Sequence, residues 1–148
     1  MSDYIVDASV VVQRLIRETY TENARALFKQ LTTAERLIVP EFCLLECTNV
    51  LWKHVRFQGM PQSHAENLVS DLIALPLTII PVQGLLTRGL QIGLIHQLAV
   101  YDSVYIALAE QLNMPLITVD ERQEKAARAL GMTIKPLTDF SLPNNDNS

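Results

Sequence analysis

Four carboxylates in this sequence lie where acid chemistry could be done. Asp7 ends the apolar run YIVD, Asp120 ends PLITVD, Asp102 opens DSVYIALAEQL, and Glu46 is the one charged residue of FCLLECTNVLW (42–52). If such groups converge, each pair repels by about 4 kcal/mol at about 4 Å and an effective dielectric near 20. The cluster would then take up protons or bind a hard divalent cation, and oxygen-only ligands favour Mg²⁺ or Mn²⁺ over zinc. A metal with open positions can bind a phosphodiester, lower the pKa of a water and stabilise a leaving oxygen.

Three of these acids also have an ordinary structural explanation. Asp7, Asp102 and Asp120 can each cap a following helix, and Gln123 can complete a capping box with Asp120. A helix cap can still contribute to a site, so the two interpretations do not exclude each other.

Glu46 cannot be a cap, because it falls inside a predicted helix. On a helical wheel it shares one stripe with Asn49 and Lys53. That stripe is either exposed on an otherwise buried helix or lines a polar cavity. A buried, unpaired carboxylate costs several kcal/mol, so a cavity would need a cation, a proton or strong donors around Glu46.

The pattern of apolar segments predicts the elements that position these acids. Strands are expected at 4–7, 36–40, 77–81, 115–120 and, at the sheet edge, 132–136; helices are expected at 8–18, 21–31, 41–57, 62–75, 84–98, 102–112 and 121–131. Apolar strands alternating with helices indicate an α/β fold with a parallel sheet covered on both faces. Ligands of such sheets bind at the carboxyl ends of the strands, where Asp7 and Asp120 fall. The helix at 41–57 is apolar almost all round and is expected to be buried.

Length and composition indicate a single globular domain. With 148 residues, 49% of them hydrophobic, we expect one domain over residues 1–137 and a disordered tail over 138–148. No apolar run approaches the roughly 20 residues of a membrane span, and the N-terminus lacks the features of a signal peptide, so a cytoplasmic protein away from membranes is expected. The net charge of −4 argues against a general basic nucleic-acid binder, but not against a nuclease with an acidic site.

Other chemistries have weaker support. The first glycine is Gly59, so no glycine-rich phosphate loop follows the first strand. A zinc site at Cys43, Cys47 and His54 would lack a second close pair of ligands. Two small core cysteines are the better interpretation of that pair.

Four ordered blocks resemble the PIN-domain ribonucleases, in particular the VapC-type toxins of prokaryotic toxin–antitoxin pairs. The blocks are IVDAS, LLECTNVLWK, YDSVYIALAE and LITVDERQEKAARALG, and the resemblance spans about residues 3–137. It implies a three-layer α/β/α sandwich around a parallel sheet of four or five strands in the order 3-2-1-4-5. It also implies Mg²⁺- or Mn²⁺-dependent endonucleolytic cleavage of RNA, a cognate antitoxin that docks near the active site, and a homodimer.

The resemblance also assigns site residues. Asp7, Glu46, Asp102 and Asp120 match the four family acids, with Asp7 and Asp102 expected to bind the metal directly and the other two to complete the site or act through water. Thr118 matches the hydroxyl residue that family members often place two positions before the last acid.

Supporting positions are less specific. Ser9 and Asn49 match common polar positions of the family. Lys53 is the best candidate for guiding RNA, because it shares the Glu46 stripe. For the remaining candidates, solvated surface charge stays the simpler explanation: Arg14, Arg56 and Arg88.

Two alternatives remain open at this point. The chain could be a PIN-like protein-binding module with little catalysis. The apolar helix at 8–16 could then contact a partner, although plain core packing is the simpler role for it. It could also be a nuclease that directs the same acids at DNA.

Overall fold

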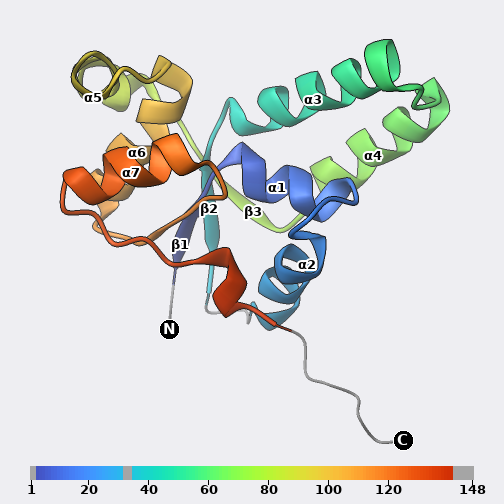
Figure 1. The fold of residues 1–148 in the computed structure, drawn as a ribbon, viewed down its shortest axis with the longest axis horizontal. Helices are drawn as coiled ribbons and strands as arrows, with labels where there is room; N and C mark the ends of the chain where they lie inside the picture. The colour runs from blue at the N-terminus through green and yellow to red at the C-terminus, as the bar shows by residue number, and fades with distance from the viewer. Residues whose placement is uncertain (1–2, 32–34, 142–148) are drawn as a thin grey trace, which may run out of the picture.

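The structure, a computed structural model, describes residues 3–31 and 35–141 and is built around one parallel sheet (Figure 1). The strands are β1 (Tyr4–Val6), β2 (Leu37–Pro40), β3 (Leu77–Ile80) and β4 (Leu116–Ile117), in the order β3-β2-β1-β4. All three strand pairs are parallel. The predicted α/β class and the order of the first four strands are confirmed.

The prediction of an edge strand at 132–136 is wrong. Ile134 forms only an isolated parallel bridge with Leu116, held by the Leu116 and Lys135 amides. β4 itself has two residues, so it offers little length for a neighbour. Pro136 then lacks the N–H that a longer ladder would require. The segment lies beside β4 as expected, but it adds a bridge and not a fifth strand.

Helices account for most of the remaining chain. They are α1 (Ala8–Leu15), α2 (Thr21–Gln30), α3 (Cys43–Gln58), α4 (Gln62–Ala74), α5 (Leu86–His96), α6 (Val100–Leu112) and α7 (Glu121–Ala129), with short 3₁₀ turns η1 (Gln83–Leu85) and η2 (Leu137–Asp139). No single helix of the described ranges is long and apolar enough to cross a membrane. The segments Gln83–His96 and Val100–Leu112 meet that length and composition only together, as a pair bent by 116°.

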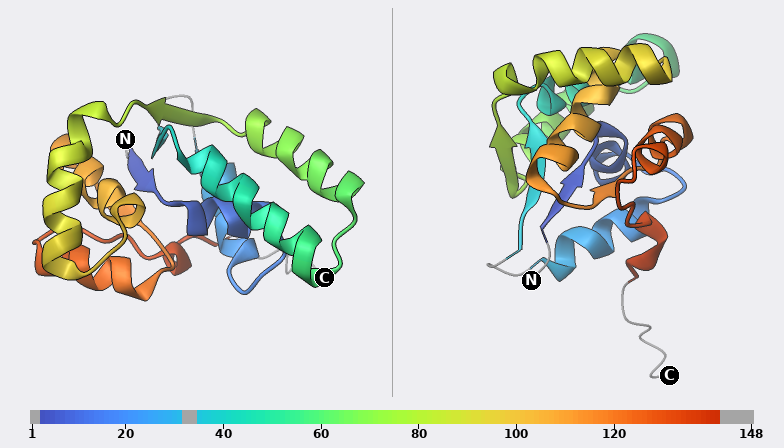
Figure 2. Two further views of the ribbon diagram at one scale, coloured as in Figure 1. Left: turned by 90° about the horizontal axis from the view of Figure 1, so that it is seen from above. Right: turned by 90° about the vertical axis from the view of Figure 1, so that its left-hand side faces the viewer.

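The prediction that the helix at 41–57 is buried is wrong. α3 buries Cys43, Cys47 and Leu51, whereas Trp52 and Phe57 are largely exposed. The reason is that α3 and α4 form a hairpin that extends away from the sheet (Figures 1 and 2). Beyond its first turns α3 is covered mainly by α4, through a separate small cluster of Leu51, Ala65 and Leu68.

α1 belongs to the main core. Val10, Val11 and Val12 are buried in the main hydrophobic cluster, and α1 packs against α2 and α3. The sequence-based alternative that this helix offers a partner surface is therefore wrong.

The fold continues past the predicted domain end at residue 137. Phe140 is buried and packs edge-on against Tyr4, with ring centroids 5.8 Å apart. The Asn23 side chain donates to the Phe140 carbonyl at 2.8 Å. The rest of the predicted tail, 142–148, lies outside the described residues.

Candidate active site

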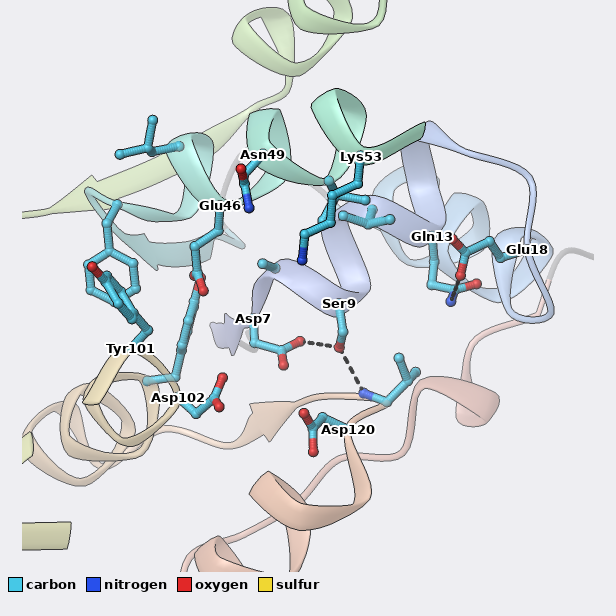
Figure 3. A pocket seen from close by; sticks show the side chains of 17 residues that line it. Asp7, Ser9, Gln13, Glu18, Glu46, Asn49, Lys53, Tyr101, Asp102 and Asp120 are labelled. Atoms are coloured by element: carbon cyan, nitrogen blue, oxygen red, sulfur yellow. Dashed lines mark hydrogen bonds between the residues drawn. The ribbon is translucent and has the colours of Figure 1, made fainter. Parts of the chain in front are cut away.

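A cleft of about 1000 Å³ brings the four predicted acids together (Figure 3). Asp7 directly follows β1, and Asp120 caps α7 just after β4. Glu46 and Asp102 lie in the first turns of α3 and α6. Ser9, Asn49 and Lys53 also line the cleft. Two of the acids therefore lie at the carboxyl edge of the parallel sheet, and the other two lie in the first turns of helices.

Asp7 is the most buried of these acids, at 4% exposed. Its Oδ1 accepts from the Ser9 hydroxyl at 2.6 Å and, as an N-cap, from the Val10 amide at 3.3 Å. Its Oδ2 accepts from the Thr118 hydroxyl at 2.8 Å. Burial raises the pKa of Asp7 to about 7 even though these donors lower it, and the charge of Asp120 raises it further.

Two hydroxyl groups hydrogen-bonded to Asp7 connect it to the segment that follows β4. The Thr118 hydroxyl accepts from the Asp120 amide at 3.0 Å, and the Ser9 hydroxyl accepts from the Val119 amide at 3.2 Å. Thr118 was predicted to be a site residue, but it lies behind Asp7 and not on the cleft wall. It acts in this structure by positioning Asp7 and Asp120.

Glu46 is held from the opposite side of the cleft. The Tyr105 hydroxyl donates to Glu46 Oε1 at 2.7 Å, and burial raises the pKa of this phenol, which keeps it a donor. Burial also raises the pKa of Glu46, opposed by the Tyr105 hydrogen bond and reinforced by the charge of Asp102. The predicted stripe of Glu46, Asn49 and Lys53 faces this cleft (Figure 3).

Asp102 does not cap its helix, contrary to one sequence interpretation. α6 starts two residues earlier, with Ala99 at the N-cap. Burial raises the pKa of Asp102, and the Asp120 charge adds to this while Arg122 opposes it. Gln123 does not complete a capping box; its Nε2 donates to the Asp102 carbonyl at 2.9 Å and so ties α7 to α6.

The cleft contains residues that the sequence did not single out. Tyr101 and Tyr105 flank Asp102 on α6, and their i, i+4 spacing could have shown that they share a face. Gln13 and Glu18 line the far end, where the Gln13 amide donates to Glu18 at 3.0 Å. No pattern in the sequence marked that second pair.

Only one of the four candidate RNA-guiding cations reaches the cleft. Lys53 is the one basic side chain among the described residues that line it. Arg88 pairs with Glu110 at 2.8 Å, whereas Arg14 lies over the Phe28 ring and Arg56 over a ring of α3. None of these three arginines lines the cleft.

Comparison with known proteins gives the family. The model of the PIN domain matches residues 4–129. The chain belongs to the PIN-domain family. Ribonuclease VapC3 of Pyrobaculum aerophilum is 29% identical over 85% of this chain and 95% of its own length. VapC ribonuclease Mb0985 of Mycobacterium bovis is 30% identical over 84% and 91%. The predicted VapC-type resemblance is confirmed.

Solved structures agree on the PIN fold. The crystal structure of PAE2754 from Pyrobaculum aerophilum matches with a TM-score of 0.71 at 18% identity, covering 93% of this chain and 92% of its own. A toxin–antitoxin complex from Klebsiella pneumoniae matches with a TM-score of 0.53 at 14% identity, covering 79% and 86%.

The donor set of this PIN domain suits a hard divalent cation. Four carboxylates line one cleft, and oxygen ligands favour Mg²⁺ or Mn²⁺. Asp7 is buried without a described ion-pair partner, and a bound cation would compensate its charge. As the side chains stand, no group of three His, Cys, Asp or Glu in the described ranges is arranged to hold a metal. Cys43 and Cys47 are buried core residues, and the neighbouring Cys43 thiol and burial both raise the pKa of the Cys47 thiol, which disfavours zinc.

Proposed function

We propose that this chain is a divalent-metal-dependent endoribonuclease. The observation that supports the proposal is that Asp7, Glu46, Asp102 and Asp120 all line one cleft of a PIN domain. Two relatives at 29% and 30% identity are named ribonucleases. RNA is therefore the favoured substrate over DNA, and cleavage is favoured over a purely protein-binding role.

The proposed mechanism divides the work among the acids. Asp7 and Asp102 would hold Mg²⁺ or Mn²⁺, with Glu46 and Asp120 completing the site. The bound cation would supply charge stabilisation at the phosphodiester and acidify an attacking water. Ser9 and Thr118 fix both Asp7 oxygens, which limits reorganisation during the reaction.

Two side chains of the α3 stripe complete this mechanism. Glu46 has a pKa raised by burial and a carboxylate oriented by Tyr105, so it can accept a proton from the water. Lys53, at the same cleft, can bind a phosphate of the strand.

Cleavage assays test this function. Wild type should cut total RNA with Mg²⁺ or Mn²⁺, and EDTA or Asp7→Asn should abolish the cutting. The matched control is Asp71→Asn, which replaces an exposed acid on α4 and should behave as wild type. Activity that survives both EDTA and Asp7→Asn contradicts the proposal. Faster cleavage of single-stranded DNA than of RNA would redirect it to DNA.

The biological role proposed is that of a toxin restrained by a cognate antitoxin, acting as a homodimer in the cytoplasm. Support comes from the VapC-type relatives and the likeness to a toxin–antitoxin complex. A small protein encoded beside this gene should copurify with the chain and suppress its RNA cleavage. Light scattering of the purified chain should give the mass of a dimer.

A further inference from the structure

Three aromatic rings form one wall of the acidic cleft. Phe42, just before α3, stands edge-on to Tyr101 and Tyr105 of α6. The ring centroids lie 5.4 Å and 5.6 Å apart, at interplanar angles of 79° and 85°. We call Phe42, Tyr101 and Tyr105 the aromatic wall. Since Tyr105 also donates to Glu46, the wall is directly connected to the acid site.

The rings of the aromatic wall differ sharply in exposure. Tyr105 is 1% exposed and completes the core, whereas Tyr101 is 61% exposed. Tyr101 immediately precedes Asp102 and lines the cleft with it. The edge contact from Phe42 restricts the Tyr101 ring, so a flat ligand that stacks on it loses little further side-chain freedom. An exposed but supported ring beside a cleft acid is suited to binding a planar group.

The charge of the cleft limits how strongly its side chains can bind the phosphate backbone of RNA. Among the residues that the structure describes, its charged lining consists of five acids and one base: Asp7, Glu18, Glu46, Asp102, Asp120 and Lys53. Lys53 can supply one phosphate contact, which by itself gives a strand only modest affinity. Stacking on an aromatic face requires no positive charge and accepts any base. The aromatic wall is therefore suited to add affinity that the phosphate contacts do not supply.

We propose that the aromatic wall is a nucleobase subsite, in which Tyr101 stacks on a base next to the phosphate that is cut. The inference rests on the proposed ribonuclease function and adds a substrate-binding residue to it. A base has to leave its helical stack to reach Tyr101, so this subsite can be occupied only by an unpaired nucleotide. The preference among bases is weak, because stacking reads no hydrogen-bond pattern.

The test uses a short single-stranded RNA with one cut site and the full chain with Mg²⁺ or Mn²⁺. Tyr101→Ala should raise KM about tenfold and leave kcat within about twofold, whereas Tyr101→Phe should keep the wild-type KM. An RNA lacking the base beside the cut should show the same loss with wild type and no added loss with Tyr101→Ala. Because stacking is not screened, the loss should persist in high salt, whereas that of Lys53→Gln should shrink.

The control is Phe57→Ala. The Phe57 ring is 67% exposed and stands edge-on to Trp52, but it lies outside the cleft. Its removal should leave KM unchanged. If wild type cuts RNA but Tyr101→Ala matches it in KM and in its response to the missing base, the subsite is overturned and the ribonuclease function stands. Equal losses with Tyr101→Ala and Phe57→Ala also overturn it, because they indicate a general surface effect. If wild type neither binds nor cuts RNA, both proposals fall.

Discussion

At the scale of single residues, the site depends on one buried acid whose charge has no described partner of opposite sign. Asp7 accepts three hydrogen bonds, but its burial still raises its pKa to about 7. Hydrogen bonds therefore replace only part of the hydration that this carboxylate loses on folding. At neutral pH the metal-free protein is therefore destabilised by the burial of the Asp7 carboxylate at the end of β1.

Replacing Asp7 by Asn should stabilise the metal-free protein above neutral pH. The folded pKa is raised, so the folded state keeps a proton that the unfolded state releases between pH 3.8 and about 7. The contribution of Asp7 to the free energy of unfolding is therefore fully present below pH 3.8, and it is lost as pH rises through about 7. The advantage of Asp7→Asn should grow across this range to at most about 4 kcal/mol. Urea unfolding in EDTA below and above the range measures it, and a difference independent of pH would contradict it.

Replacing Thr118 by Val should impair cleavage without unfolding the chain. The change removes the donor to Asp7 and the acceptor of the Asp120 amide while keeping the side-chain shape. A hydrogen bond to a charged group contributes about 1.5–3 kcal/mol, so kcat should fall by roughly 10- to 100-fold. Thr118→Ser should restore most of it. The pH–rate profile should shift upward in Thr118→Val, since Asp7 loses a donor that lowers its pKa. An unshifted profile would assign Thr118 another role.

Residue types and spacing predicted part of this site. Asp7 and Asp120 follow apolar strands, and Glu46 could not be a cap, so a shared cleft was a reasonable hypothesis. The hydrogen bond from Tyr105 to Glu46 was not predictable, because it joins positions 59 residues apart. Sequence periodicity reports which residues share a face of one element, but not which faces meet.

At the scale of elements, close packing of α5 on α6 sets the position of Asp102. Two glycines of α5 allow this approach: a Cβ on Gly89 would lie 2.8 Å from Val104, and one on Gly93 would lie 2.9 Å from the Leu98 carbonyl. The Ser103 hydroxyl crosses the contact and donates to the Gly89 carbonyl at 2.6 Å. Asp102 is the residue before Ser103, so the helix contact and the acid move together.

Gly93→Ala should destabilise the fold because the new methyl group meets backbone that cannot rotate away. Overpacking of this kind costs about 1–3 kcal/mol. Gly84→Ala is the control, since a Cβ there meets nothing within 4 Å. Thermal unfolding of both variants measures the difference. Equal melting temperatures would show that α5 and α6 can separate at little cost.

Element prediction failed where tertiary context decides the outcome. The predicted strand at 115–120 ends after Ile117, since Thr118 and Asp120 turn to the site. The apolar α3 was expected in the core, yet it leaves the sheet after a few turns. Apolar composition alone does not distinguish a buried helix from one that exposes apolar side chains.

At the scale of the whole molecule, the acids raise the cost of folding and a cation should lower it. Burial raises the pKa of Asp7, Glu46 and Asp102, and a neighbouring acid adds to each shift. Ligands that bind only the folded state stabilise it by mass action. Mg²⁺ or Mn²⁺ would therefore link the cleft to the stability of the entire domain.

The melting temperature should accordingly rise with millimolar Mg²⁺ or Mn²⁺. At 100 times the dissociation constant the gain is about 2.7 kcal/mol. Asp102→Asn should lose most of this rise, whereas the Asp71→Asn control should keep it. Differential scanning fluorimetry with and without EDTA measures the shift. A wild-type melting temperature that stays the same with either metal would contradict the proposed site.

The hairpin of α3 and α4 has a consequence for local opening. Its outer part rests on the small cluster of Leu51, Ala65 and Leu68, separate from the main core. Regions with little buried apolar surface open at lower free energy than the global unfolding. Amide hydrogen exchange should therefore be faster in the distal turns of α3 than around Glu46. If so, the protein can loosen one end of a helix while the other end keeps an acid in place.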